Sequence, residues 1–275
     1  APSRKPVIIT IHDLSFIKTP QFAHPRLARY LSGAVPRAID RASAIVAVSQ
    51  ATADDILETY PAARGKVVAI PNGVDPVFVQ PGAALIDASL QRLGILHPYF
   101  VIVGTIEPRK NHLGVLKAFE WAHERRPELS LVIAGRPGWL SEPIMSAIRS
   151  DSTRLPVIHL EGLSDDELAA VIAGSLALVY PSWYEGFGLP VAEAMAGGTA
   201  VITSRGGALE EVAGGAALLV DPADVEGMAE AMVKLYDDPA LRRQLIERGN
   251  ERVRWLTWER SAASHWALYR KVAFG

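Results

Sequence analysis

The chain has 275 residues, of which 49% are hydrophobic and 21% are charged, so it can bury a large core and does not have the composition of a disordered protein. Its formal net charge of −2 offers no broad positive field to nucleic acid, and its lack of cysteine excludes a disulfide framework, a thiolate zinc site and a cysteine nucleophile. No apolar run is long enough to span a bilayer, and a reducing cytoplasm is the compartment we expect.

The first segment of the chain alternates short aliphatic runs with amphipathic stretches, which is typical of a parallel sheet flanked by helices. This pattern predicts strands over residues 7–11, 44–48 and 66–70, with helices over 25–41 and 51–59. Pro71, Asn72 and Gly73 then interrupt the order, and Asp75-Pro76 begins a connection that contains proline and glycine and reaches about Leu96. We place a domain boundary between residues 92 and 93.

The second segment predicts a complete doubly wound unit of parallel strands. Its predicted strands are residues 99–103, 129–134, 157–160, 176–180, 200–203 and 217–220, and its predicted helices include 111–125, two within 223–253 and a last one over 257–273. The first segment offers three strands where such a sheet usually has about five or six. We therefore interpret it as an incomplete Rossmann-like domain whose upstream part is absent from this sequence.

The most informative stretch is residues 185–193, EGFGLPVAE, directly after a predicted strand. Its two glycines permit a positive φ and a close approach of the backbone to a ligand, and Pro190 suits the first turn of a helix. Free amides and the dipole at a helix start favour a phosphate there. Glu185 could accept hydrogen bonds from sugar hydroxyls, while Glu193, about one turn into the helix, could grip a ribose diol. The alternative is a tight turn with a helix-start glutamate, which the dipole alone would stabilise.

A second cluster, residues 104–111, follows the first strand of the second segment and reads GTIEPRKN. Arg109 suits bidentate contact with a phosphate and Lys110 adds a point charge. Together they could neutralise a diphosphate, including the charge that develops as it leaves. Open α/β sheets bind ligands at the carboxyl ends of their strands, which favours this interpretation over a solvated basic turn.

In the first segment, His12 and Asp13 follow the first predicted strand and Ser49 follows the second. Both positions lie at the edge where a crevice between two domains would open. His12 could donate a hydrogen bond to a sugar hydroxyl, although a structural histidine is the alternative. Asn72-Gly73 is interpreted as a turn without a catalytic role.

These residues resemble the retaining glycosyltransferases of family 4, which have the GT-B fold of two Rossmann-like domains. Glu185 and Glu193 match the E-x7-E motif of that family, and residues 104–111 resemble its diphosphate loop. The fold class that the resemblance implies is α/β, GT-B type, with an incomplete N-terminal domain and linker over 1–92, a nucleotide-sugar-binding domain over 93–256, and a last helix, 257–275, that returns to the N-terminal domain.

The resemblance also implies a role for each candidate residue. Arg109 and Lys110 would bind the donor diphosphate, Glu185 the transferred sugar, and His12 would lie near the C6 end of that sugar; these are the residues we assign to catalysis. The resemblance implies further donor-binding residues in the two loops and the helix start that follows, in the first segment, and in the Gly162-Leu163 turn, which would face the base. They are Ser49, Gly104, Thr105, Leu163, Phe187, Gly188, Leu189 and Glu193. Many members carry an arginine where this chain has Thr105, so Arg109 must serve as the main guanidinium.

The mechanism that follows is a transfer with retained anomeric configuration and without a metal. The sequence offers no obvious nucleophilic carboxylate on the reacting face, so we expect front-face attack in which the leaving diphosphate accepts the acceptor proton. The chain has no Asp-x-Asp pair to bridge a metal to the diphosphate, so we expect no metal ligands and no cofactor beyond the nucleotide-sugar substrate.

The EPRKN loop and the WYEGFG stretch resemble mannosyltransferases that use GDP-mannose in surface-polysaccharide assembly. We therefore expect transfer of a hexose, mannose above others, to a glycan or lipid-linked acceptor, with peripheral contact at the inner face of a membrane and no nucleic-acid partner. A UDP-glucose or UDP-N-acetylglucosamine donor stays open as an alternative. Two other functions stay open as well. The chain could be a fragment that binds the donor without transfer and is completed by an upstream segment of a longer natural chain, or it could be an epimerase of the same fold.

Overall fold

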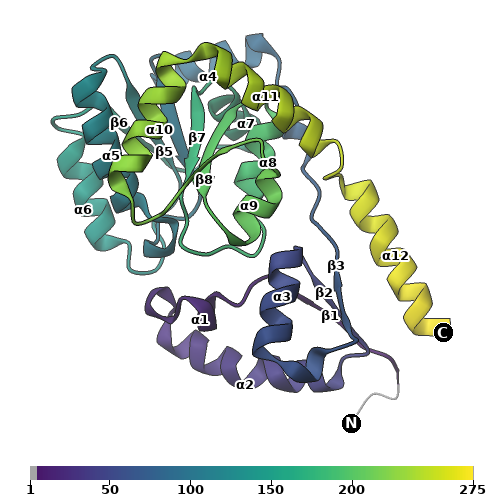
Figure 1. Ribbon diagram of the computed structural model, residues 1–275. Helices are drawn as coiled ribbons and strands as arrows, with labels where there is room; N and C mark the ends of the chain where they lie inside the picture. Colours follow the sequence, from purple (N-terminus) through teal and green to yellow (C-terminus); the bar gives the residue numbers. More distant parts are fainter. Residues whose placement is uncertain (1–4, 275) are drawn as a thin grey trace.

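The computed structural model describes residues 5–274 and arranges them as two α/β units, shown in Figure 1. The first unit contains β1 (Ile8–Ile11), α1 (Ser15–Lys18), a 3-10 turn η1 (Pro20–Phe22), α2 (Pro25–Arg41), β2 (Ala44–Ala47), α3 (Gln50–Thr59), η2 (Pro61–Ala63) and β3 (Val67–Ala69). The second unit begins with η3 (Pro76–Phe78), α4 (Ala83–Leu93), β4 (Tyr99–Val103), η4 (Pro108–Lys110), α5 (His112–Arg125), β5 (Ser130–Ala134), α6 (Glu142–Asp151), β6 (Val157–Leu160) and α7 (Asp165–Ala173). It continues through β7 (Ala177–Tyr180), α8 (Leu189–Ala196), β8 (Ala200–Ser204), α9 (Gly207–Ala213), β9 (Leu218–Val220), α10 (Val225–Asp237) and α11 (Pro239–Val253), and the described chain ends with α12 (Trp258–Phe274).

The larger sheet has six parallel strands, as predicted, and their order is β6-β5-β4-β7-β8-β9. From β4 the chain continues to β5 and β6 toward one edge of the sheet, and from β7 it continues to β8 and β9 toward the other edge. Open α/β sheets bind ligands at such a reversal of strand order, which lies here between β4 and β7. Helices α4, α7, α8 and α9 contribute to the core on one face of the sheet, and α5, α6, α10 and α11 to the core on the other. This topology brings the loops after β4 and β7 together at one edge.

The smaller sheet is parallel, with β2 between β1 and β3, and β2 is buried along its whole length. Successive side chains of a strand point to opposite faces, so Ile45 and Ala47 join one cluster with α2 and α3, while Ala44 and Val46 join a second cluster. That second cluster includes Leu268 of α12. The last helix thus returns to the first unit, as the family resemblance implied.

The connection expected over residues 75–96 contains helix α4, which the sequence reading missed. Leu90 of α4 and Ile95 are buried in the core of the second unit, and Gly94 ends the helix in the left-handed conformation with φ of 67°. The proposed boundary between residues 92 and 93 therefore falls at the end of a helix that packs with the second unit. The polypeptide crosses between the units nearer Gly73.

Two crossing segments run side by side at this point. The Val74 amide donates to the Leu256 carbonyl over 2.9 Å, and Val74 forms a parallel bridge with Thr257. A Cβ on Gly73 would lie 2.1 Å from the Trp258 nitrogen, so the glycine is required by this close approach rather than by a turn alone. Within the described residues, no helix is both long and apolar enough to cross a membrane.

Candidate functional site

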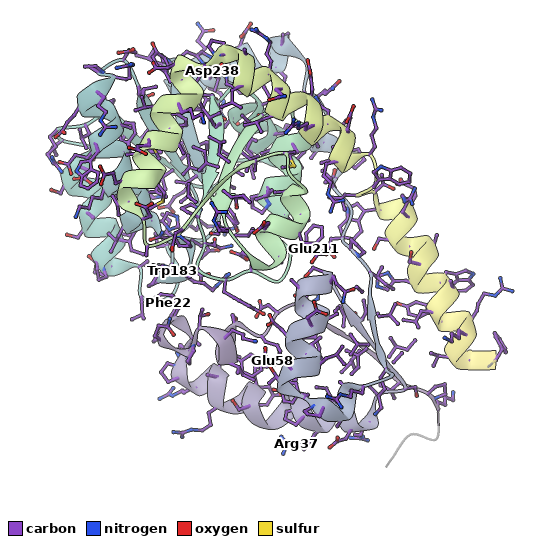
Figure 2. The ribbon with its side chains drawn as sticks, in the orientation of Figure 1. Phe22, Arg37, Glu58, Trp183, Glu211 and Asp238 are labelled. Carbon is purple, nitrogen blue, oxygen red and sulfur yellow. The ribbon has the colours of Figure 1, made fainter. Side chains whose placement is uncertain are left out.

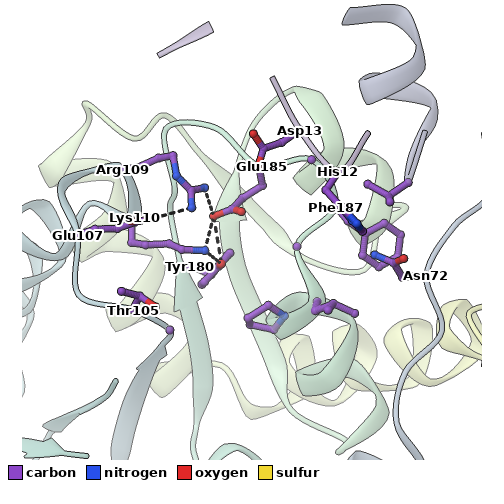
Figure 3. Close-up of a pocket in the computed structure, with 16 residues that line it drawn as sticks. His12, Asp13, Asn72, Thr105, Glu107, Arg109, Lys110, Tyr180, Glu185 and Phe187 are labelled. Atoms are coloured by element: carbon purple, nitrogen blue, oxygen red, sulfur yellow. Dashed lines mark hydrogen bonds and ion pairs between the residues drawn. The ribbon is translucent and has the colours of Figure 1, made fainter. Parts of the chain in front are cut away.

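Glu185 and two cations form an ion cluster just beyond the end of β7 (Figure 3). Its Oε1 atom lies 2.9 Å from Arg109 Nη1 and 2.6 Å from Lys110 Nζ. The Tyr180 hydroxyl donates to the same oxygen over 3.1 Å and also contacts Lys110. Arg109 uses its other terminal nitrogen to pair with Glu107 at 2.6 Å. The loops after β4 and β7, which the sequence singled out separately, therefore meet in one cluster.

The electrostatics keep this cluster charged. Burial acts to raise the pKa of Glu185, but the charges of Lys110 and Arg109 outweigh it and hold that pKa below its ordinary value. Burial, followed by the charge of Glu185, raises the pKa of Tyr180 well above its ordinary value, so the phenol keeps its proton. Burial also lowers the pKa of His112 to about 4, so the imidazole adds no third positive charge near neutral pH.

A cavity of about 360 Å³ opens beside the ion cluster, between the two units. Its walls are His12, Asp13, Val48, Asn72, Gly104, Thr105, Glu107, Arg109, Lys110, Tyr180 and residues 185–190. The four residues that the sequence assigned to catalysis, and five of the eight assigned to donor binding, line this one cavity. His12 approaches it from the first unit, opposite Arg109 and Lys110 (Figure 3).

The start of α8 closes one end of the cavity. Gly188 is the residue before the helix and has φ of 97°, and Leu189 and Pro190 line the wall. Pro190 lies in the first turn, where its missing N–H leaves no hydrogen bond unmade. A helix start of this kind presents free amides and a positive dipole end to an anion. Glu185, Arg109 and this helix start thus surround the same space.

Gly186 is required for a different reason than the sequence suggested. We expected both glycines of the loop to permit a positive φ, but among them only Gly188 adopts one. A Cβ on Gly186 would lie 1.7 Å from the His12 carbonyl oxygen. The small residue therefore allows the loop to pack directly against the backbone of the first unit.

Side chains at the start of α3 hold this loop from the first unit. Ser49 Oγ donates to the Gly186 carbonyl over 2.6 Å, and Thr52 Oγ1 donates to the same oxygen over 2.9 Å. Ser49 Oγ also accepts from the Thr52 amide and so caps α3. Ser49 is fully buried and lies outside the cavity wall, so its hydroxyl acts on the loop backbone instead of facing the donor space.

A carboxylate of the second unit caps the same helix. Glu211 in α9 accepts hydrogen bonds from the Gln50 and Ala51 amides over 2.8 and 2.7 Å. A charged acceptor at a helix start satisfies free N–H groups and interacts favourably with the dipole. We call the contacts of Ser49, Thr52 and Glu211 the α3 clasp. They join the two units across the cleft, and Figure 2 shows Glu211 near the start of α3.

Two predicted donor-binding residues lie outside the first cavity. Leu163 lines a neighbouring cavity of about 220 Å³, which shares Gly104 and Thr105 with the first. Glu193 lies in α8 and lines neither cavity. Burial, with the nearby charges of Asp165 and Asp75, raises the pKa of Glu193 to about 7.

Tyr180, Glu107 and Asn72 are among the residues of the cavity wall to which the sequence patterns assigned no role. Tyr180 could have been found, because it is the one residue with a polar group in the strand sequence ALVY and stands at its carboxyl end. Asn72 was interpreted as part of a turn, and only the approach of the two units brings it to the cavity.

Comparison with known proteins places the chain in a family. Residues 95–252 match the family described as "Glycosyl transferases group 1", and residues 1–78 match "Glycosyltransferase Family 4". The chain belongs to the glycosyltransferases of these families. This confirms the resemblance that the sequence motifs carried.

Curated relatives of this glycosyltransferase include mannosyltransferases. It is 30% identical over 257 residues to O-antigen chain mannosyltransferase B of Escherichia coli, and 34% identical over 235 residues to the MMP alpha-(1->4)-mannosyltransferase of Mycolicibacterium hassiacum. The matched regions cover 92% and 83% of this chain, but 67% and 54% of the two relatives. The chain therefore spans between about half and two thirds of the length of these relatives.

Solved structures confirm the GT-B fold. Sucrose-phosphate synthase from Thermosynechococcus elongatus superposes with a TM-score of 0.80 and 26% identity, over 96% of this glycosyltransferase and 67% of that chain. Anabaena Alr3699/HepE, solved in complex with UDP and glucose, superposes with a TM-score of 0.81 over 97% of this chain and 72% of that one. At 18% identity the second likeness concerns the fold alone.

The α3 clasp predicts that Glu211 holds the two units together. Replacing Glu211 with Ala removes a charged acceptor from two amides, and we expect the free energy of unfolding to fall by about 1–3 kcal/mol. The radius of gyration measured by small-angle X-ray scattering should increase as the cleft opens. Glu210→Ala is the control, because the Glu210 carboxylate accepts only from Gly206 of its own unit among the hydrogen bonds described. An unchanged radius for Glu211→Ala, or an equal increase for both variants, would contradict a closing role.

The pKa of Glu193 predicts a loss of stability with rising pH. Its pKa of about 7 lies above the ordinary 4.5, so between these values the folded protein binds more protons than the unfolded chain. Its contribution is therefore fully present below about pH 4.5 and is lost as the pH rises through about 7. Glu193→Gln, which mimics the protonated acid, should become more stable than the unaltered protein by about 3 kcal/mol at pH 8 while matching it near pH 4.5. Urea unfolding at several pH values measures the difference in unfolding free energy between the two proteins. A difference that does not change with pH would refute the raised pKa of Glu193.

Proposed function

We propose that this protein is a retaining glycosyltransferase that moves mannose from GDP-mannose to a glycan or lipid-linked acceptor. The observation that supports the proposal most directly is the pairing of Glu185 with Arg109 and Lys110 at the reversal point of the larger sheet. The work would take place in the cytoplasm, at the inner face of a membrane when the acceptor is lipid-linked.

The donor diphosphate would lie between the two cations and the start of α8. Arg109 and Lys110 are already held in place by Glu107 and Glu185, so little reorganisation is needed when the departing phosphate gains charge. The amides that precede and begin α8 would bind phosphate oxygens from the other side. The oxygen atoms of Glu185 would accept hydrogen bonds from hydroxyls of the transferred sugar.

Front-face attack is supported by the carboxylates that line the cavity. Glu107 and Glu185 are both paired with cations, which makes them weak nucleophiles. Asp13 accepts a hydrogen bond from the Ser15 amide over 2.8 Å. With its carboxylates engaged in this way, the wall favours a mechanism in which the acceptor hydroxyl attacks from the side of the leaving diphosphate, and a phosphate oxygen takes its proton.

The names of the relatives favour mannose as the transferred sugar. Besides the two mannosyltransferases described above, the chain is 28% identical over 268 residues to the serotype-specific mannosyltransferase WbdA of Escherichia coli. Retention of configuration would be tested by nuclear magnetic resonance of the product anomer.

Removing both cations tests the catalytic proposal. We expect Arg109→Ala/Lys110→Ala to lower kcat by roughly 100-fold or more, because stabilisation of the leaving charge is lost. Arg149→Ala is the control, since Arg149 pairs with Glu142 on the exposed face of α6. Circular dichroism reports whether the double variant stays folded with Glu185 left without its cations. A loss of less than about tenfold in a folded double variant would exclude this role.

Nucleotide preference tests the identity of the donor. Calorimetric titration of the chain with GDP, UDP and their sugar conjugates should give tighter binding for GDP and GDP-mannose than for the uridine compounds. Each factor of ten in affinity corresponds to about 1.4 kcal/mol, which calorimetry resolves. Tighter binding of UDP or UDP-glucose would replace the proposed donor and leave the family unchanged.

A further inference from the structure

A second interdomain cavity adjoins the donor cavity and has no role in the proposal above. It encloses about 190 Å³ between the start of the first unit and the loops after β4 and β5. Phe22, His24 and Leu27 line it from the first unit, and Glu107, Arg109 and Trp139 from the second.

The two cavities share one wall. Glu107 and Arg109 line both of them. These two side chains pair with each other, and Arg109 also pairs with Glu185. A ligand in the second cavity would therefore sit next to the guanidinium that we assign to the leaving diphosphate. For front-face attack, this is the side from which an acceptor hydroxyl must arrive.

Aromatic rings from both units line this cavity or lie next to it: Phe22, His24 and Trp139 line it, and Trp183 lies outside its wall. The His24 ring lies 4.1 Å from the Trp139 ring, measured between centroids, and the Phe22 and Trp183 rings lie 6.2 Å apart. Trp139 is 39% exposed and Trp183 is 41% exposed, so both keep accessible ring surface. Figure 2 places Phe22 and Trp183 next to each other across the gap between the units. The Trp183 amide donates to the Arg109 carbonyl over 2.9 Å, which ties this ring to the shared wall.

The mixture of rings and charges fits a sugar better than an alkyl chain. The C–H faces of a pyranose pack on aromatic rings, while its hydroxyls need nearby donors and acceptors. Glu107 and Arg109 offer both, whereas an alkyl chain would remove water from this ion pair without replacing its hydrogen bonds. We propose that this cavity binds a pyranose ring of the acceptor glycan, with Trp139 as the ring against which it packs. This inference rests on the proposed glycosyl transfer and names the acceptor side of the same site.

Saturation-transfer nuclear magnetic resonance with α-linked mannotriose as the probe tests the assignment. The unaltered chain should transfer saturation to ring protons of the glycan. Trp139→Ala should weaken binding roughly tenfold or more, since aromatic residues at the centre of a contact carry much of its energy. Trp139→Phe, which keeps a ring, should restore most of the affinity. Trp266→Ala is the matched control, because Trp266 is exposed on α12.

GDP titration of the same variants separates this inference from the donor proposal. Equal GDP affinity in all variants, together with loss of mannotriose binding in Trp139→Ala alone, supports the acceptor site. If the chain binds no GDP but its mannotriose binding still depends on Trp139, the glycan site is supported and the proposed GDP-mannose donor is overturned. Absence of mannotriose binding, equal binding by Trp139→Ala, or binding of decyl phosphate in its place would overturn the acceptor site.

Discussion

Three consecutive residues after β7 are held from opposite sides of the cleft, and the arrangement of the whole site depends on this constraint. The Tyr184 hydroxyl donates to Asp55 over 2.8 Å and accepts from the Leu14 amide, both in the first unit. Glu185 pairs with Arg109 and Lys110 in its own unit. The carbonyl of Gly186 turns back to the first unit and accepts two hydrogen bonds there. A loop bound in this alternating way has little freedom, so the position of its carboxylate depends on both units at once.

This constraint couples closure of the cleft to the electrostatics of the site. The Glu185 side chain is only 11% exposed, and a largely buried carboxylate costs free energy unless cations and hydrogen bonds compensate it. Its partners lie on the loop after β4, which the order of the parallel sheet places beside the loop after β7. Removing either the cations or the contacts from the first unit would therefore disturb the same carboxylate. The cavity is thus a product of two units, and neither of them forms it alone.

The local pattern of the sequence was sufficient for most of the secondary structure and for the two loops that line the donor cavity. Strands β4 and β6 begin and end where they were predicted, since each is a short aliphatic run between turn residues. The Gly-Phe-Gly-Leu-Pro stretch, after a predicted strand, predicted a loop and a helix start, because glycine and proline act on their own backbone conformation. Helix α4 was missed because the prolines and glycines before it indicated a linker. Its packing against the second unit could not be inferred from the pattern of neighbouring residues.

Tertiary structure alone decided which side chains share a surface. Arg109 and Glu185 are far apart in the sequence and meet only because strand order reverses between β4 and β7. Tertiary packing also brings Glu211 to the start of α3 and forms the second cavity beside Trp139. It separates Glu193 from Glu185: the sequence grouped these two residues, but Glu193 lies outside the cavity that Glu185 lines. The sequence by itself determined most of the helices and strands, the family and the residue types at the ends of the strands, because these depend on neighbours along the chain. Contacts between the units depend on how two separately folded surfaces meet, and no local pattern encodes that geometry.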